Sequence, residues 1–276
     1  MRLFARRWSV ILWTVISAAL LSGVVPVWGL PTPYSYYALD NNTTDVVGHR
    51  NGTLLGDATF STNVPPLLTG YSTHSLQLDG TRDKMIYASK PGDVVTGTFT
   101  VAMWVDPQEV RPEGALGFLG TRTPSTYGFD IKFRDKNSPT IRVDVGNGSS
   151  FSSISDLSYP WAINQWHHIA VVVAPTKFDL YVDGDLLGSR SYSATTPVLV
   201  GLNNDLAIGS VYAYDQPNGP PYGEDFHGLI DDVRIYTQAL TQAEIREVMN
   251  VPEPSSILVV SCGAIAAIGL TRPKAK

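Results

Sequence analysis

The middle of the chain is a succession of short apolar, β-branched runs separated by turn residues, and this pattern restricts the fold more than any other feature. In residues 98–105, TFTVAMWV, apolar and small polar residues alternate, as in a half-buried strand. Similar runs occupy residues 166–173, 178–182, 206–209 and 228–236. Asp183-Gly184 follows residues 178–182 and supplies the positive φ angles of a two-residue hairpin turn, so we expect antiparallel pairing with residues 185–187.

One helix is predicted near the end of this region. Thr241 and Glu244 form a capping box, and Ile245, Val248 and Met249 follow on one apolar side. Many strands, frequent turns and a single late helix predict an all-β fold: a two-sheet antiparallel β-sandwich with one short C-terminal helix.

The same region resembles a known family, the laminin-G-like, concanavalin A-like jelly-roll domains. The blocks that carry the resemblance occur in the family's order and span about residues 35–249: SLQLDG (75–80), FTVAMW (99–104), WHHIA (166–170), LYVDG (180–184), LAIGS (206–210) and FHGLIDDVRIYTQAL (226–240). Each block alone is weak, but the ordered set is specific. The resemblance implies a concanavalin A-like jelly roll in residues 30–250.

The N-terminus has the features of an export signal. Arg2, Arg6 and Arg7 precede an apolar region, residues 8–27, and Gly29 offers a small residue for cleavage. We therefore expect a signal peptide in residues 1–29, with an uncleaved membrane anchor as the alternative. Either reading takes the chain out of the cytoplasm.

Residues 251–276 predict a membrane-inserted tail. The segment from residue 254 to residue 271 carries no charge, is apolar all round, and would span about 27 Å as a helix. Val251, Pro252, Glu253 and Pro254 precede it, and its basic end is interrupted by proline. This arrangement resembles the bacterial PEP-CTERM sorting signal. The resemblance implies exosortase-type machinery as a partner, transient anchoring in the inner membrane, and delivery to the cell surface or extracellular matrix.

Composition narrows the partners of residues 30–250. This segment has 14 basic and 24 acidic residues, a formal net charge of −10, which disfavours nucleic acid and anionic membrane surfaces. The sole cysteine, Cys262, lies in the tail, so the domain has no disulfide and must be stabilised by its core or by a metal.

Asp231 is the residue that most strongly suggests a metal. Strand alternation puts it on the same face as Val233 and Ile235, which would bury a carboxylate among apolar side chains. Such a group needs a metal, an arginine or backbone N–H donors.

The family resemblance implies a structural Ca²⁺ at this place, with further ligands from an early segment, residues 40–52. That segment is rich in carboxylate and amide oxygens, so we expect Asp45, Asn51 and Asp231 as ligands. The alternative is that Asp231 caps a turn.

Catalysis is not expected. Related sandwich folds include glycoside hydrolases with paired carboxylates on one face. Residues 30–250 contain five glutamates, at positions 109, 113, 224, 244 and 247, and no predicted strand presents two of them. A Gly-x-Ser-x-Gly nucleophile motif is also missing.

A binding role fits better. The stretch 212–225 combines Tyr212, Tyr214, Asp215, Asn218 and Tyr222 with prolines, so it could stack on sugar rings and offer hydrogen bonds. Trp161 and Tyr127 are candidates for the same surface, and a loop that packs on its own prolines is the alternative. We expect an exported bacterial surface or matrix protein that binds extracellular glycan or protein without catalysis. The alternatives are a degenerate hydrolase and a purely structural matrix component.

Overall fold

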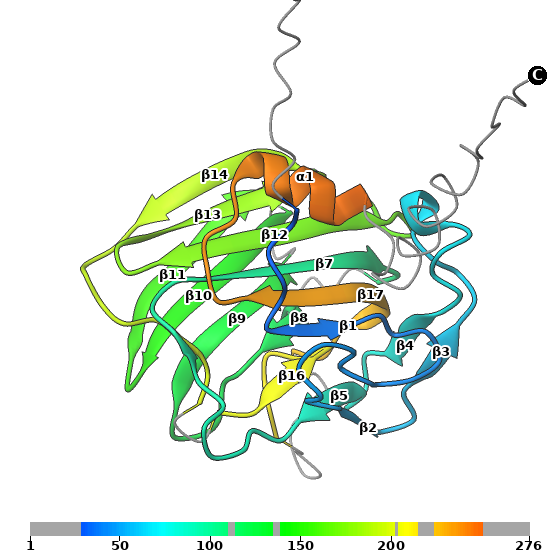
Figure 1. Ribbon diagram of the computed structural model, residues 1–276, viewed down its shortest axis with the longest axis horizontal. Coiled ribbons are helices and arrows are strands. Elements are labelled where there is room, and N and C mark those ends of the chain that lie inside the picture. The colour runs from blue at the N-terminus through cyan, green and yellow to red at the C-terminus, as the bar shows by residue number, and fades with distance from the viewer. Residues whose placement is uncertain (1–28, 110–113, 135–138, 202–203, 215–223, 251–276) are drawn as a thin grey trace, which may run out of the picture.

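The computed structural model describes residues 29–109, 114–134, 139–201, 204–214 and 224–250. The expected signal peptide and sorting tail lie outside these residues. The described chain forms a two-sheet antiparallel sandwich, which confirms the predicted fold (Figure 1).

The larger sheet follows the order β14 (Asp185–Ser191), β13 (Lys177–Val182), β12 (His167–Ala174), β7 (Phe99–Pro107), β17 (His227–Tyr236), β4 (Ser75–Asp79), β3 (Thr59–Ser61), with β1 (Ser35–Tyr37) also paired to β17. The second sheet follows β11 (Phe151–Ser158), β10 (Thr140–Gly148), β9 (Tyr127–Arg134), β8 (Leu116–Gly120), β16 (Leu206–Ile208), β5 (Lys84–Tyr87), β2 (Thr53–Leu55). β6 (Val95–Thr96) and β15 (Val198–Val200) form a separate pair, and η1 (Pro66–Leu68) and α1 (Gln242–Asn250) are the helices.

The predicted local signals are confirmed. Asp183 and Gly184 have φ values of 51° and 78°, and they connect β13 to β14 in an antiparallel hairpin. At the start of α1, Thr241 donates its backbone N–H to the Glu244 carboxylate, and the Glu244 N–H donates to the Thr241 hydroxyl. Neither helix in the described part of the chain has the length and apolar character of a membrane span.

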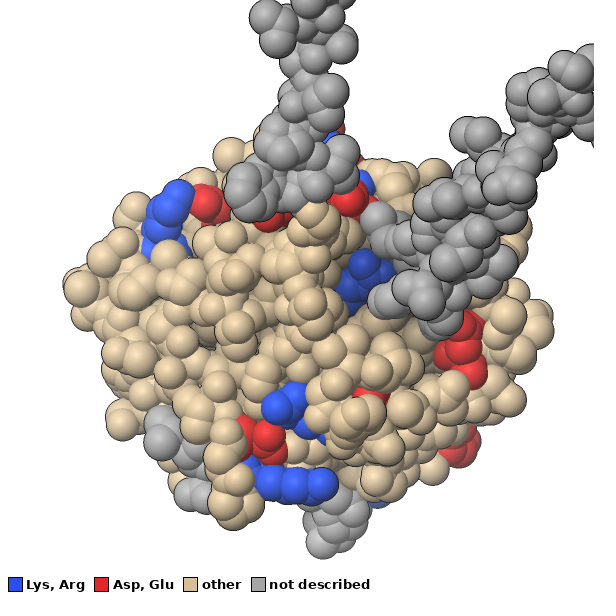
Figure 2. Space-filling model, in the orientation of Figure 1, with Lys and Arg blue, Asp and Glu red and all other residues tan. Residues whose placement is uncertain are grey.

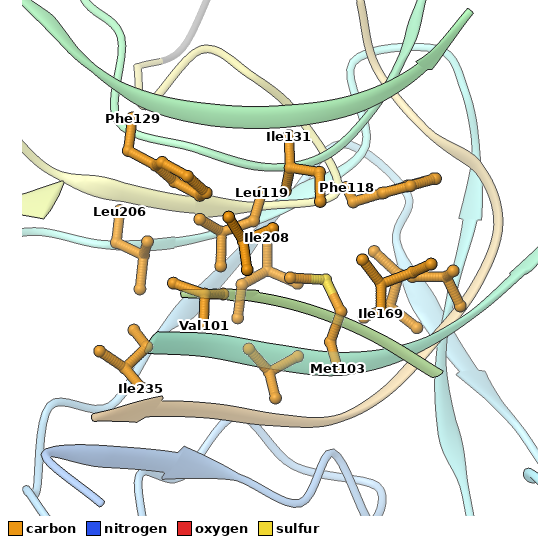
Figure 3. Close-up of a cluster of buried hydrophobic side chains, with 14 of the residues drawn as sticks. Val101, Met103, Phe118, Leu119, Phe129, Ile131, Ile169, Leu206, Ile208 and Ile235 are labelled. Atoms are coloured by element: carbon orange, nitrogen blue, oxygen red, sulfur yellow. The ribbon is translucent and has the colours of Figure 1, made fainter. Parts of the chain in front are cut away.

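The main core lies between the two sheets. Figure 3 shows Val101, Met103, Ile169 and Ile235 of the larger sheet facing Phe118, Phe129 and Ile131 of the second sheet, and all seven are buried. Burial of each such side chain contributes about 1.5–3 kcal/mol, so a core of this size can hold a domain without disulfides.

A smaller apolar cluster lies on the outer side of the larger sheet. There Ile245 and Val248 of α1 pack on residues of β7, β12, β13 and β17: Ala102, Ala170, Val172, Tyr181 and Tyr236. Figure 1 shows α1 lying against this sheet. The helix therefore covers one end of a sheet face that would otherwise expose apolar residues.

Candidate binding surface and calcium site

Asp45 and Asn51 lie together, but their side-chain oxygens hold the early loop in shape. Asp45 is fully buried, and its Oδ1 accepts the N–H groups of Tyr36, Val47 and Gly48 at 2.8–3.1 Å. The Asn51 Oδ1 accepts the Asp45 N–H at 3.1 Å. These contacts order residues 45–51 into a compact turn.

Asp231 does not lie on the face that strand alternation predicts. The pairing of β17 with β7 shifts register between Asp231 and Arg234, and Asp232 has a φ of 52°, so β17 contains a bulge. The extra residue reverses the alternation. As a result, Val233 and Ile235 point into the main core, whereas Asp231 lies opposite Trp104 on the outer side of the sheet. The prediction that Asp231 shares a face with Val233 and Ile235 is therefore wrong.

Asp231 is nevertheless buried, under the loop that follows η1. Its Oδ2 accepts the Ser72 hydroxyl at 2.9 Å, and its Oδ1 accepts the Asp232 N–H at 2.9 Å. Burial, together with the negative charges of Asp232 and Asp40, raises the pKa of Asp231 well above its usual value. Among the described residues, the hydrogen bonds of Asp45 and Asn51 stay within the early loop and β1, and those of Asp231 go to Ser72 and Asp232.

Ser72 is surrounded by more acceptors than one hydroxyl can satisfy. Its Oγ lies 2.9 Å from Asp231 Oδ2, 3.0 Å from the His74 carbonyl oxygen and 3.3 Å from Asp40 Oδ1. A serine hydroxyl has a single proton to donate. Two carboxylates and a carbonyl that converge on one hydroxyl form the all-oxygen surroundings that Ca²⁺ prefers.

A second acidic group was not predicted. Asp57, Asp79 and Asp83 bring carboxylate oxygens within 4.8 Å of one another. Asp83 accepts the N–H groups of Asp57 and Asp79 at 2.8 and 3.1 Å, and burial raises its pKa to about 6. These donors tie the Asp57 segment to the turn between β4 and β5, and the three carboxylates form a second group that could hold a cation.

The predicted tyrosine stretch is described in part: Tyr212 and Tyr214 are placed, while Asp215, Asn218 and Tyr222 lie outside the described residues. The rings of Tyr212 and Tyr214 meet edge to face at 5.8 Å. The guanidinium of Arg122 lies 5.4 Å from the Tyr212 ring and donates to its hydroxyl at 3.5 Å. Arg122, which the sequence did not single out, is thus the neighbour of this stretch.

Arg122 joins the two tyrosines to a second aromatic pair. Its guanidinium lies 4.9 Å from the ring of Phe151, which in turn meets Tyr127 edge to face at 5.1 Å. Tyr127 is 40% exposed. We call this surface the Arg122 site; it comprises Arg122, Tyr127, Phe151, Tyr212 and Tyr214. Tyr127 therefore joins the predicted surface.

Trp161 belongs elsewhere. Its ring stacks on Phe118 at a centroid distance of 5.6 Å and lies tilted against Phe133 at 5.4 Å, and it also contacts Tyr159 and His167. These contacts anchor the ring against the core, so Trp161 is a packing residue in this structure.

A buried charge cluster lies beneath the Arg122 site. Lys132 Nζ contacts Asp130 Oδ1 at 2.7 Å and Asp144 Oδ2 at 2.9 Å, and Arg122 Nη2 lies 3.5 and 3.6 Å from the same two side chains. Glu224 adds a third carboxylate, 3.6 Å from Arg122 and 3.4 Å from Lys132. Burial raises the pKa of Asp130 to about 7, with the Asp144 charge acting in the same direction and Lys132 opposing.

The register of β9 and β10 brings these charges together. Asp130 stands opposite Asp144, and Lys132 opposite Arg142, on the face turned away from the core. The alternation of Asp130, Lys132 and Arg134 along one strand was the available signal in the sequence. This alternation indicates a charged face, but it does not indicate that a loop covers the face.

The segment that covers this charged face consists of residues 209–214 and 224–226. Backbone contacts hold it in place. Val211 accepts the Arg122 N–H, Glu224 accepts the Gly117 N–H, and a Cβ on Gly120 would meet the Val211 carbonyl oxygen at 2.3 Å. Glycine is therefore required where this segment crosses β8.

Lys84 and Asp225 form a buried ion pair at the base of the covering segment. The Lys84 Nζ lies 2.9 Å from Asp225 Oδ1 and donates to the Ser210 hydroxyl at 3.3 Å.

Comparisons with known proteins agree with this architecture. Human usherin is 26% identical over 167 residues, which is 60% of this chain and 3% of usherin. Adhesion G-protein coupled receptor V1 of Danio rerio is 21% identical over 203 residues, 68% of this chain and 3% of the receptor. The chain thus spans a small fraction of the length of these relatives.

Among solved structures, domain 4 of AbnA, a GH43 extracellular arabinanase from Geobacillus stearothermophilus in complex with arabinotriose, is similar. It has a TM-score of 0.57 and 21% identity, and the match covers 79% of this chain and 98% of the domain. The ligand-binding domain of botulinum neurotoxin serotype D, in complex with N-acetylneuraminic acid, has a TM-score of 0.55 and 15% identity. This match covers 78% of this chain and 50% of the neurotoxin chain. At this level of sequence identity, the structural similarity shows a shared fold.

The model of one family matches residues 79–246, more than half of the chain, which includes β7, β12 and β17 and ends in α1. This chain belongs to that family, Laminin_G_3, of the concanavalin A-like lectin/glucanases superfamily.

Proposed function

We propose that this protein is a non-catalytic binding module whose Arg122 site holds an extracellular glycan. The continuous series of contacts from Tyr127 through Phe151, Arg122 and Tyr212 to Tyr214 carries the proposal. Aromatic rings offer flat apolar faces to the C–H faces of sugars, and the Arg122 guanidinium and tyrosine hydroxyls offer hydrogen bonds. A protein ligand is the alternative partner for the same surface.

The comparisons support a binding role. AbnA domain 4 was solved with arabinotriose and the neurotoxin domain with N-acetylneuraminic acid, so sandwiches of this fold hold sugars in other proteins. At the Arg122 site, the two carboxylates that stand opposite each other, Asp130 and Asp144, are almost completely buried and both contact Lys132. A carboxylate enclosed in this way is poorly placed to reach a glycosidic bond, which favours binding over hydrolysis.

A glycan microarray tests the proposal. Wild-type protein is expected to bind at least one glycan class, and Tyr127→Ala and Tyr212→Ala are each expected to weaken binding about tenfold or more. Tyr71→Ala is the matched control, because Tyr71 is 51% exposed and lies outside the Arg122 site. Equal loss in all three variants, or no binding by the wild type, would contradict the proposal.

We further propose that Ca²⁺ stabilises the domain at Asp231. Of the expected ligands we retain Asp231, and we add Asp40 and Ser72 because the three side chains converge. The bound ion would offset the repulsion between the carboxylates, and Asp45 and Asn51 would order the adjoining loop.

Thermal unfolding with and without calcium tests this site. Saturation at about 100 times the dissociation constant stabilises a protein by about 2.7 kcal/mol, and we expect Tm to rise by about 5–10 °C. Asp231→Asn should remove this rise, whereas Asp83→Asn should leave it intact. A rise lost in Asp83→Asn alone would assign the ion to the other acidic group, and an unchanged Tm after chelation would refute calcium binding.

We also propose that the protein is exported and sorted to the cell exterior. The basic, apolar N-terminus and the Pro252-Glu253-Pro254 tail support delivery through the inner membrane to the cell surface or matrix. A full-length chain with an internal epitope tag should appear outside the cytoplasm without residues 1–29. Recovery of the intact chain in the cytoplasm would refute this part.

A further inference from the structure

The cations at the Arg122 site are already matched by carboxylates. Arg122 is 18% exposed and faces Asp130, Asp144 and Glu224, while Lys132 is 3% exposed and contacts the same three side chains. Burial lowers the pKa of each cation, but these carboxylates outweigh it, so both remain protonated. The cluster therefore has two positive groups and three carboxyl groups.

The neighbouring part of the same face follows this pattern. Arg142 binds Asp156 through Nη2 at 2.5 Å and Nε at 2.9 Å, and Arg134 Nη1 lies 3.6 Å from the same carboxylate. In the register of β9, β10 and β11, Arg142 stands between Lys132 and Asp156 on one face. Within the described residues of this face, each arginine and lysine of β9 and β10 has a carboxylate partner.

Glu224 is the carboxylate of the cluster that solvent reaches. Its side chain is 28% exposed, while Asp130 and Asp144 are 0% and 2% exposed. Glu224 Oε2 contacts both Arg122 Nη1 and Lys132 Nζ, so it occupies the position from which an incoming anion would approach either cation. A sugar carboxylate there would meet the negative charge of Glu224 before it could pair with Arg122.

We propose that the Arg122 site selects uncharged glycans and that Glu224 is the residue that excludes acidic sugars. This inference rests on the proposed function and goes further by naming the class of glycan. A neutral sugar can stack on the aromatic rings and exchange hydrogen bonds with Arg122 and Glu224 without displacing an ion pair. A uronic or sialic acid must break such a pair or place two like charges side by side, and interfaces use that cost to reject wrong partners.

Glu224→Gln is the decisive substitution because it removes one charge with almost no change in shape. The backbone bond from the Gly117 N–H to the Glu224 carbonyl remains, so the covering segment keeps this anchor. Arg122 and Lys132 then lose a competing carboxylate and can accept one from a ligand. Glu109→Gln is the matched control, since Glu109 is a 36% exposed carboxylate that pairs with His227.

The test uses the full secreted chain on a microarray of neutral oligosaccharides and of uronic and sialic acid oligosaccharides, at constant calcium and low salt. Wild type and Glu109→Gln should bind neutral probes and leave acidic probes at background. Glu224→Gln should keep the neutral signal within about twofold and raise the acidic signal about tenfold.

The two proposals fail in different ways. Wild-type binding to acidic probes that equals or exceeds binding to neutral ones would overturn the selectivity while leaving glycan binding intact. A Glu224→Gln variant that keeps neutral binding but gains no acidic binding would remove the role of Glu224. Failure of the wild type on every probe would overturn the proposed function, and this inference with it.

Discussion

Lys84→Met should be among the most destabilising single changes in the second sheet. Lys84 is 2% exposed, and its ammonium contacts Asp225 at 2.9 Å and Ser210 at 3.3 Å. Methionine fills a similar volume but leaves the Asp225 carboxylate buried without its cation. Breaking a buried ion pair in this way costs about 3–5 kcal/mol. For a domain of this size we expect Tm to fall by about 6–20 °C.

Urea unfolding followed by tryptophan fluorescence measures this change. The denaturant slope should remain as in the wild type, because the surface exposed on unfolding changes little. The double variant Lys84→Met/Asp225→Asn removes the unpaired charge, and its amide oxygen can still accept the Arg82 N–H that Asp225 accepts at 3.1 Å. We expect the double variant to regain more than half of the lost stability.

Two results would refute this reasoning. A loss below about 1 kcal/mol in Lys84→Met would mean that solvent reaches Asp225 and that the pair behaves as a surface salt bridge. A double variant as unstable as the single one would show that the unpaired charge of Asp225 is not the cause of the lost stability.

Three further changes have expected outcomes. Burial raises the pKa of Asp106 to about 6, whereas the carboxyl group in the unfolded chain releases its proton near pH 4. The ionised, buried carboxylate therefore destabilises the native state at pH 8, and Asp106→Asn should stabilise the protein there by about 1–2 kcal/mol. At pH 4 the substitution should have almost no effect, and thermal melts at both pH values measure the difference. Thr241→Ala removes the hydroxyl that caps α1 and should cost about 1 kcal/mol in urea unfolding, whereas Thr241→Ser should cost little. Gly120→Ala should displace Val211, costing about 1–3 kcal/mol and weakening glycan binding on the same microarray, and unchanged values would contradict the close approach seen here.

The elements of the fold could be predicted because their signals are local. The Asp183-Gly184 turn and the Thr241–Glu244 capping box each act within a few residues and appear in the structure as expected. The alternation in residues 98–105 correctly predicts a strand, β7, but the expected half-burial is wrong, because every residue of β7 is buried and α1 covers part of its outer face. The expected signal peptide and sorting tail stay predictions, since they lie outside the described residues.

The predicted sites were less complete. Tyr212 and Tyr214 lie in the proposed binding surface, but Arg122 and Phe151, which complete it, come from segments far away in the sequence. Asp231 was recognised as a buried carboxylate that needs partners, yet its face was wrong, because the bulge at Asp232 inserts one residue into the alternation.

The amino-acid sequence alone determined that the chain forms an antiparallel sandwich with one capped helix, because strand period, turn type and helix capping depend on neighbouring residues. The tertiary structure decided which charges meet. Asp130, Lys132, Asp144 and Glu224 converge through strand register and a crossing segment, and Asp231 meets Ser72 and Asp40 through a bulge and a distant loop. Register and loop placement result from the packing of the whole domain, so short-range patterns do not contain them.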